Sequence, residues 1–368
     1  MQIFVVETRF AESDRGAGDP RSALIGRLLS EFPFAKVTWF ASERNDSDRY
    51  QAALVQMGIT PVDEPPAYAL AARANDADVV VVARPENFEW AAGIIDRYQP
   101  QARKVYDFES LFHLRMEREA QLRVGDERDR FAVMARTLRE LERAAAFWAD
   151  AVLCVGQAEQ DFVRSIRPAL PVGIASYFPE VVPPFVPRDA RNAVAYFGGF
   201  RAGPHGPNSE GAILAARKVQ PLLGMPLEIS GACPPENVLG LAGPDVRVVG
   251  PVPDFRAYIA SRLVLLCPML VGAGIKLRFV DAAACGTPFV TTAVGAEGIG
   301  LDGELARLLV AETPEQLAER TRALVDDKGC WNAASDGLRA LATERFTREQ
   351  FASALRLAVL GPRSEPHP

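Results

Sequence analysis

Residues 271–297 read VGAGIKLRFVDAAACGTPFVTTAVGAE, and this stretch decides the fold. Small residues open it, a helical pattern follows, and the turn CGTP at 285–288 ends the helix. A β-rich run at 289–292 comes next, and a second glycine loop at 295–298 closes the stretch. This order is half of a βαβ unit. In an open parallel sheet, the helix N-terminus and the carboxyl end of the strand border the ligand crevice.

Lys276 is the unusual residue of this stretch. It is expected in the first turn of the helix, where the macrodipole disfavours a cation by about 0.3–1 kcal/mol. A loop with Gly272 and Gly274, the N–H groups of the helix start and a lysine together form an anion site, and a bound phosphate reverses the penalty. The alternative is a solvated Lys276 beside an Arg278–Asp281 pair at i,i+3. Both interpretations remain open from this stretch alone.

Length and composition restrict the class of protein. The chain has 368 residues, which suits two domains of about 150–190 residues each. Hydrophobic residues make up 48% and charged residues 24%, the balance of an ordinary globular protein. The net charge of −6, with no basic block, argues against a nucleic-acid partner.

Cysteine and histidine usage predicts no metal site. The five cysteines are an odd number, widely spaced and without a CxxC pair, which favours reduced thiols in a cytosol. No apolar run approaches 18 residues, so we expect neither a signal peptide nor a transmembrane helix, and a cytoplasmic location. The mixed charges at 115–143 are most simply a solvated helix face, although a basic side leaves peripheral contact with the inner face of the cell membrane open.

The first half of the chain alternates strand-like and helix-like segments. Strands are predicted at 2–7, 36–41, 59–62, 77–83, 104–108 and 151–155. Helices are predicted from residue 20 and at 47–56, 68–73, 86–97, 126–148 and 157–166. This alternation is typical of a doubly wound α/β domain. Four prolines at 178–187 then exclude a central strand or helix and predict an interdomain linker.

The second half repeats the alternation. Strands are predicted at 193–197, 227–230, 247–249, 263–267, 289–292 and 308–310, and helices at 208–219, 254–261 and 314–325, besides the one after residue 274. A capping box at Thr347 and Gln350 starts the last helix. The domains expected are 1–180, a linker at 181–190, 191–345, a helix at 346–360 that packs back towards the first domain, and a tail at 361–368.

Several motifs of the second half, in order, resemble the nucleotide-sugar domain of the GT-B glycosyltransferases, specifically glycosyltransferase family 4 (group 1). They are YFGG at 196–199, HGPN at 205–208, VGPVPD at 249–254, CP at 267–268 and GxGxKxRxxDAxAxGTP at 272–288. The resemblance covers about 194–325. In the first half, YDxE at 106–109 and HLR at 113–115 resemble the acceptor-side domain of the family more weakly.

The resemblance implies two Rossmann-like doubly wound domains facing a central cleft. It also implies transfer of a sugar from a nucleotide-sugar donor, a UDP- or GDP-sugar, to an acceptor hydroxyl. The implied mechanism is retaining and metal-independent, with no tightly bound cofactor. A glycan, a lipid-linked or a small-molecule acceptor is implied, and polysaccharide synthesis at the cell envelope is the expected setting.

One departure from the family pattern concerns two acidic positions. Many members carry two glutamates separated by seven residues, whereas this chain has Asp281 at the second position and Ala273 at the first. The acid usually placed near the donor sugar is therefore missing. This motivates one alternative, a non-catalytic sugar-nucleotide-binding protein. A second alternative is a sugar-nucleotide epimerase or phosphorylase with the same architecture.

The resemblance assigns roles to the residues around the lysine. Asp281 is the expected ribose ligand, because a carboxylate accepts hydrogen bonds from two vicinal hydroxyls. Lys276 and Arg278 are expected to neutralise the diphosphate and assist its departure. They are two residues apart and do not share a helix face, so we expect Lys276 to contact the phosphate directly.

Four further residues complete the expected donor site. Gly198 and Gly199 end a strand and either let the backbone approach a ligand or form a simple β-turn. His205 lies in the next loop and is a candidate ligand. In the same loop, Asn208 is better explained as a helix N-cap. Glu297, in the second glycine loop, is a candidate partner for a sugar hydroxyl.

The acceptor side offers two carboxylates and a glycine loop. Asp107 and Glu109 alternate on an extended run, so both point the same way at the carboxyl end of a strand. Either orients an acceptor hydroxyl or acts as a base, or the pair caps a helix near Ser110. Gly16 and Gly18 form the first βα loop and are expected to meet the donor phosphates after domain closure.

Overall fold

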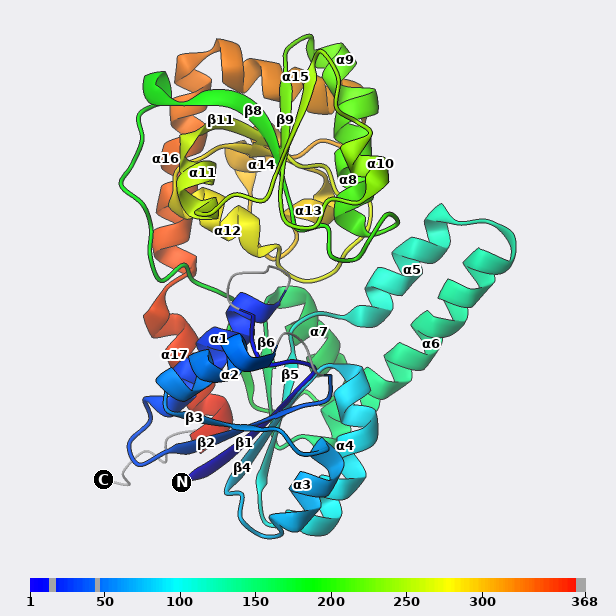
Figure 1. Cartoon of the computed structure of the whole chain (residues 1–368), viewed down its shortest axis with the longest axis vertical. Coiled ribbons are helices and arrows are strands. Elements are labelled where there is room, and N and C mark those ends of the chain that lie inside the picture. The colour runs from blue at the N-terminus through cyan, green and yellow to red at the C-terminus, as the bar shows by residue number, and fades with distance from the viewer. Residues whose placement is uncertain (13–17, 44–46, 362–368) are drawn as a thin grey trace. The chain divides into compact units, whose positions relative to one another are not determined.

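The computed structural model describes residues 1–12, 18–43 and 47–361. The chain divides into two compact units, which are treated separately below. The first unit comprises Met1–Ser176 together with the chain from Glu349 onward, and the second comprises Tyr177–Arg348. Both are parallel sheets with helices on their faces (Figure 1), which confirms the predicted α/β class.

The sheet of the first unit has seven parallel strands in the order β3-β2-β1-β4-β5-β6-β7. Their bounds are β1 Gln2–Glu7, β2 Lys36–Ala41, β3 Ile59–Val62, β4 Val79–Ala83, β5 Arg103–Phe108, β6 Ala151–Cys154 and β7 Val172–Ile174. The order runs outward in one direction from β1 and in the other from β4. The reversal between β1 and β4 is the place where such sheets bind ligands.

The valines of β4 explain why this strand is central. Val80 and Val82 point into a core of aromatic and aliphatic side chains, whereas Val79 and Val81 are buried on the opposite face. The helices of this unit are α1 Asp19–Ser30, α2 Ser47–Gln56, α3 Pro66–Ala72, α4 Pro85–Tyr98, α5 Phe112–Leu122, α6 Gly125–Trp148, α7 Gln157–Ile166 and α17 Arg348–Leu360. The core on the Val80 side is shared with α3, α4, α6 and α7.

The last helix, α17, packs on the first unit. A Cβ at Gly173 of β7 would lie 2.5 Å from the carbonyl oxygen of Ala354, so glycine allows this close approach. The Arg103 guanidinium donates a hydrogen bond of 2.7 Å to the carbonyl of Ala358. Helices α5 and α6 form a hairpin that extends away from the sheet (Figure 1).

The sheet of the second unit has five parallel strands in the order β10-β9-β8-β11-β12. Their bounds are β8 Asn192–Phe197, β9 Leu227–Ser230, β10 Val246–Gly250, β11 Arg262–Leu266 and β12 Phe289–Val290. Its reversal lies between β8 and β11. Figure 1 shows α11 Phe255–Ser261, α12 Leu277–Ala284 and α16 Lys328–Arg345 on one side of this sheet.

The other helical segments of the second unit are short, apart from α15. They are the 3-10 turn η1 Arg188–Ala190, α8 Pro207–Leu214, the π-helical turn η2 Ala215–Val219, α9 Gln220–Leu223, α10 Glu236–Leu239, α13 Ala293–Ala296, α14 Gly303–Leu309 and α15 Pro314–Asp326. The predicted Asp254 cap is confirmed, since its carboxylate accepts from the backbone N–H of Ala257 at 2.9 Å.

Two local predictions are wrong. Residues 308–310 are not a strand: α14 extends to Leu309, and only Val310 forms an isolated bridge to Thr291. Asn208 is not an N-cap, because Pro207 occupies the first helical position of α8 and starts the helix earlier. The sequence analysis also omitted β7, α5 and α16.

Arg191 holds the turn that ends α12. Its guanidinium donates to the carbonyl of Val186 at 2.8 Å, to the Thr287 hydroxyl at 2.5 Å and to the carbonyl of Cys285 at 2.9 Å. It also lies 5.0 Å from the ring centroid of Trp331. Burial lowers the pKa of Arg191 to about 10. This arginine fastens the chain before β8 to the CGTP turn.

Candidate functional site

The carboxyl edge of the second unit's sheet brings the predicted glycines and cations together. Gly198 follows β8, and the loop that leads to α12 follows β11, so both lie at the strand-order reversal. Open α/β sheets bind ligands in the crevice at this point. This edge is therefore the candidate site.

Lys276 is buried at the start of α12. It occupies the N-cap position, one residue before the predicted first turn. Its Nζ donates to the carbonyl of Gly274 at 2.7 Å and lies 3.5 Å from the Glu297 carboxylate. Gly272 and Gly274 have φ angles of +152° and +66°, so the loop needs glycine to place its backbone beside the lysine. A buried ammonium next to first-turn N–H groups is suited to an anion.

Arg278 is hydrogen-bonded to the end of β8. Its Nη1 donates to the carbonyl of Phe197 at 2.6 Å, and its Nη2 lies 2.8 Å from the sulfur of Met269. A Cβ at Gly198 would lie 2.4 Å from Nη1, so a larger residue at this position would displace the Arg278 guanidinium. The alternative in which Arg278 pairs with Asp281 is therefore wrong. That Lys276 and not Arg278 contacts the phosphate directly remains a prediction.

Asp281 is the acceptor of a buried triad. Its Oδ1 accepts from Arg256 Nε at 2.8 Å and from the Tyr177 hydroxyl at 3.3 Å, and Arg256 Nη2 donates to the same hydroxyl at 2.8 Å. Burial raises the pKa of Asp281, while the Arg256 charge and the two hydrogen bonds oppose this rise. Because the side chain is 3% exposed, a ribose contact requires a rearrangement or the other carboxylate oxygen. Arg256 and Tyr177 were not predicted from sequence.

The loop after β8 is closed by one amide. Asn208 Nδ2 donates to the carbonyl of Gly199 at 2.5 Å. This hydrogen bond gives the asparagine a role although it is not the N-cap of α8. His205, between them, is exposed. Gly231 was not predicted: its φ is +150°, and a Cβ there would collide with the carbonyl oxygen of Gly198.

On the first unit, Asp107 forms a buried bidentate pair. Its two carboxylate oxygens accept from Arg21 Nη1 and Nη2 at 2.7 and 2.8 Å. Arg21 Nε also donates to the carbonyl of Ala175 at 2.8 Å. Both side chains are almost completely buried, so this pair fastens α1 to β5. The geometry does not favour Asp107 as a base or as a ligand of an acceptor hydroxyl.

Glu109 lies at the carboxyl edge of the same sheet. Its side chain is 11% exposed, and its Oε1 lies 3.3 Å from Arg84 Nη2. A Cβ at Gly18 would lie 2.8 Å from Oε1, so the predicted glycine and the carboxylate are neighbours. Gly16, the other predicted glycine of this loop, lies outside the described residues.

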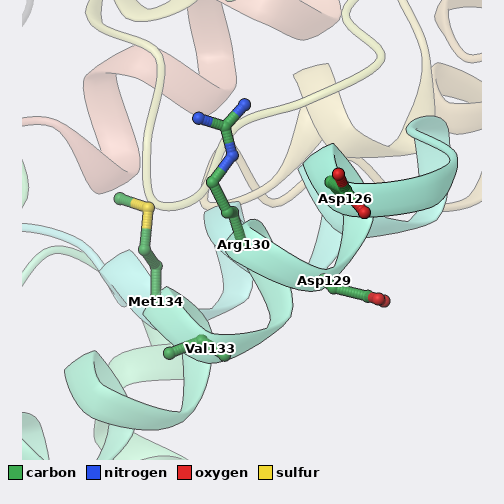
Figure 2. Close-up of a pocket in the computed structure, with 5 residues that line it drawn as sticks. All are labelled: Asp126, Asp129, Arg130, Val133 and Met134. Carbon is green, nitrogen blue, oxygen red and sulfur yellow. The ribbon is translucent and has the colours of Figure 1, made fainter.

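A separate hollow lies on α6 and is not the site. Figure 2 shows that one helix supplies its lining, namely Asp126, Asp129, Arg130, Val133 and Met134. These residues follow one another at helical spacing along one face, so their polar groups do not converge from several elements.

Two other classes of site are absent from the described ranges. No group of three histidine, cysteine, aspartate or glutamate side chains there is arranged to hold a metal ion. None of the helices in the described part of the chain has the length and apolar character needed to cross a membrane.

Comparison with known proteins bears on the fold and on the family of the second unit. Residues 194–327 match the family described as Glycosyl transferases group 1. No curated protein matches the chain. The fold is similar to that of sucrose-phosphate synthase from Thermosynechococcus elongatus, with a TM-score of 0.69 and 16% identity over 96% of this chain and 97% of the other.

Two further structures are similar over nearly the whole chain. Anabaena HepE in complex with UDP-glucose has a TM-score of 0.67 and 12% identity, covering 98% of this chain and 100% of its own. The lipopolysaccharide outer core galactosyltransferase WaaB has a TM-score of 0.64 and 11% identity, covering 98% and 99%. At such identities the likeness establishes the fold alone. The chain thus has the GT-B fold of these glycosyltransferases, and its second unit matches the group 1 glycosyl transferases.

Proposed function

We propose that this protein is a retaining, metal-independent glycosyltransferase that moves a sugar from a nucleotide-sugar donor to an acceptor hydroxyl. The observation that carries the proposal is Lys276, a buried ammonium held between the glycine loop and the first turn of α12. The donor diphosphate replaces Glu297 as its anionic partner. The family match over residues 194–327 supports glycosyl transfer.

The remaining donor contacts follow from the same edge. Asp281, together with Arg256, binds the ribose, and Arg278 orders the Gly198–Gly199 backbone beside the diphosphate. Glu297 and His205 bind sugar hydroxyls. Lys276 and the first-turn N–H groups stabilise the charge that develops on the departing diphosphate, as electrostatic preorganisation does elsewhere.

The donor and acceptor are proposed by class. HepE binds UDP and UDP-glucose, which supports a UDP-sugar here, with a GDP-sugar as the alternative. Glu109 orients the acceptor hydroxyl or receives its proton. Asp107 is left out because Arg21 occupies both of its oxygens. We place the activity in the cytoplasm and in polysaccharide synthesis. The acceptor is a glycan, a lipid-linked or a small molecule. The family proposed is glycosyltransferase family 4.

Ala273 favours a second candidate, a non-catalytic sugar-nucleotide binder. It occupies the position at which many relatives carry the acid near the donor sugar, and it offers no polar group. Such a binder would hold the donor at the same edge without turnover.

Release of nucleoside diphosphate from a panel of UDP- and GDP-sugars, with and without cell-derived acceptors, separates these candidates. A transferase releases diphosphate faster when an acceptor is present. Binding of a nucleotide sugar without release on any acceptor supports the binder. Binding of none of the panel contradicts both.

Lys276→Gln tests directly whether the Lys276 ammonium binds the diphosphate. A charge-assisted contact is worth about 1.5–3 kcal/mol, so the Kd for the nucleoside diphosphate should rise roughly 10- to 100-fold. Lys218→Gln, an exposed lysine of the same unit, is the matched control and should leave the Kd unchanged. Equal effects of the two substitutions would remove the basis of the proposal.

A further inference from the structure

A mixed-charge cluster occupies the strand-order reversal of the first unit's sheet. Glu7 ends β1 and Arg84 directly follows β4, the two strands that flank the reversal. Arg84 Nε lies 3.3 Å from Glu7 Oε1, and Arg84 Nη2 lies 3.3 Å from Glu109 Oε1. One guanidinium therefore bridges two carboxylates at the position where open α/β sheets bind ligands.

The backbone of Arg84 is strained to reach this position. Its φ and ψ are 72° and 145°, in a region that is close to glycine-only. The following Pro85 accounts for the extended ψ but not for the positive φ. A non-glycine residue persists in this conformation when its surroundings hold it, and here two carboxylates hold its side chain. The side chain is only 14% exposed.

Two polar atoms of the cluster are unsatisfied. Glu109 Oε2 and Arg84 Nε are shielded from solvent, and neither makes a hydrogen bond to a residue that the structure describes. Arg84 Nε has only the ion contact of 3.3 Å with Glu7 Oε1, which does not have hydrogen-bond geometry. One is an acceptor and the other a donor, and both belong to the bridged group. Buried polar atoms are nearly always paired, so an unpaired donor and acceptor together indicate a bound molecule that supplies both.

The charge balance of the cluster is acidic. Glu7 and Glu109 flank the Arg84 guanidinium, and Asp19 and Glu86 also act on it. A second guanidinium, Arg21, acts on Glu109, but its hydrogen bonds go to Asp107. Burial, with help from Glu109 and Asp19, raises the pKa of Glu7 to about 7, while Arg84 opposes this rise. The Glu7 carboxylate is held by the Thr8 backbone N–H at 2.9 Å and faces the Ser22 hydroxyl at 3.3 Å.

We propose that Glu7, Arg84 and Glu109 form the acceptor subsite, and that it selects a neutral or amino-bearing sugar and rejects an anionic one. This rests on the proposed glycosyl transfer and names the acceptor class. A sugar hydroxyl donates to Glu109 Oε2, and the same or a vicinal hydroxyl accepts from Arg84 Nε. A phosphate or carboxylate on the acceptor meets more carboxylates than cations, and such repulsion is what excludes wrong partners.

The test is direct acceptor binding to the full chain, measured by titration calorimetry and saturation-transfer NMR. The probes are methyl glycosides of glucose, galactose and mannose, each in a neutral, a 2-amino-2-deoxy and a 6-phosphate form. The neutral or amino form of at least one sugar should bind at least roughly tenfold more tightly than its 6-phosphate, because a like-charge contact disfavours the phosphate by at least this factor. A 6-phosphate that binds equally well or better overturns the proposal, as does binding of none of the nine.

Variants locate the binding. Glu109→Gln should weaken the neutral sugar and reduce the discrimination against its 6-phosphate, and Glu7→Gln should reduce that discrimination without removing binding. Glu89→Gln removes one exposed carboxylate from α4 and is the matched control, with no expected effect. If Glu109→Gln does not fold, the near-isosteric Glu7→Gln carries the test. Unchanged discrimination in the variants that fold places the sugar elsewhere and overturns the assignment.

Nucleotide-sugar binding and diphosphate release are measured on the same preparations. A chain that discriminates among the nine sugars but releases no diphosphate refutes the proposed transfer and keeps the acceptor assignment. A chain that releases diphosphate to 6-phosphate acceptors keeps the transfer and refutes the acceptor class.

Discussion

The two sheets reverse their strand order once each, and the chain places opposite chemistry at the two reversals. In the second unit the edge is glycine-rich and cationic, with Lys276 and Arg278. In the first unit it is acidic, with the carboxylates of Glu7 and Glu109 on either side of Arg84. Topology therefore fixes where a ligand meets each sheet, and the residue types at the edge decide which ligand it is.

The comparison extends to one arginine beside each edge. Arg21 is matched by a full carboxylate, Asp107, on both of its terminal nitrogens. Arg278 donates instead to a neutral carbonyl and contacts a methionine sulfur. The first arrangement anchors an element through charge, and the second shapes a loop. The two should respond very differently to substitution.

The largest expected effect is that of Asp107→Ala. It leaves the Arg21 charge buried without its partner, which typically lowers the free energy of unfolding by about 3–5 kcal/mol. Urea denaturation, with hydrogen exchange of α1 and β5, measures this loss in the first unit.

Arg278→Met is the comparison for this prediction. It removes the guanidinium donor from the Phe197 carbonyl, which keeps only the weak Cys267 Sγ donor at 3.7 Å, and the typical loss is about 1–3 kcal/mol. Equal losses in the two variants would contradict the distinction between an anchoring and a shaping arginine. Full donor turnover in a folded Asp107→Ala protein would confirm that Asp107 is not the base.

The second prediction concerns the pH dependence of stability at the acidic edge. The folded-state pKa of Glu7 is about 7, against an ordinary value of 4.5. Because the folded pKa is higher than the unfolded one, the protonated Glu7 contributes to the free energy of unfolding. This contribution is complete below about pH 4.5 and is lost as the pH rises through 7. At about 1.36 kcal/mol per unit, the loss reaches roughly 3 kcal/mol.

Glu7→Gln mimics the protonated form and should remove this loss. Urea denaturation of both proteins at pH 5, 6, 7 and 8 gives the difference between their profiles, which cancels the contributions of other groups. The variant should be the more stable protein at pH 8, and the two should converge at pH 5. Parallel profiles would show that Glu7 is ionised in the folded protein throughout this range.

Much of the fold was predictable because the local signals are strong. The runs at 2–7, 36–41, 59–62 and 227–230 and the helices at 47–56 and 157–166 have the predicted bounds. Each is a short apolar run or an amphipathic segment between turn residues. The strand predicted at 308–310 failed because three apolar residues fit the end of a helix equally well. Helix α5 was missed because its buried contacts, such as the His113–Glu142 pair, are to α6 and not within its own sequence.

The candidate site was predictable only in part. Sequence identified the glycine loop and Lys276, because a cation at a helix start conflicts with the local electrostatics and calls for a ligand. It did not identify Arg256 and Arg84, because each finds its carboxylate far along the chain. Asp107 looked available for the same reason, since its partner Arg21 lies 86 residues away.

The third prediction concerns the close packing of the cationic edge. Gly198→Ala introduces a Cβ into the position of Arg278 Nη1, and overpacking of this kind typically lowers stability by about 1–3 kcal/mol. The displaced loop should also weaken diphosphate binding. Gly243→Ala is the control, because the nearest atom to its added Cβ lies 4.0 Å away. Thermal unfolding and calorimetric titration with UDP measure both effects, and equal behaviour of the two variants would contradict the packing argument.

The smallest expected effect is also the one that most sharpens the comparison. Glu297 is a carboxylate that lies 3.5 Å from Lys276, and its side chain is 30% exposed. Such a contact is worth about 0.2–1 kcal/mol. If Glu297 is the stand-in for the diphosphate, Glu297→Gln should bind UDP up to roughly fivefold more tightly, because the phosphate no longer displaces a competing anion.

The sugar separates the two roles proposed for Glu297. A carboxylate that also accepts from a sugar hydroxyl loses part of that hydrogen bond as an amide, so UDP-glucose should gain less than UDP from the substitution. Calorimetric titration of both ligands gives the ratio of the two changes. Equal gains would leave Glu297 as a counter-ion only, and weaker binding of UDP would show that the diphosphate does not take its place beside Lys276. Glu297 would then stabilise the cationic edge by balancing the Lys276 charge, as Arg84 balances the carboxylates at the acidic edge of the first unit.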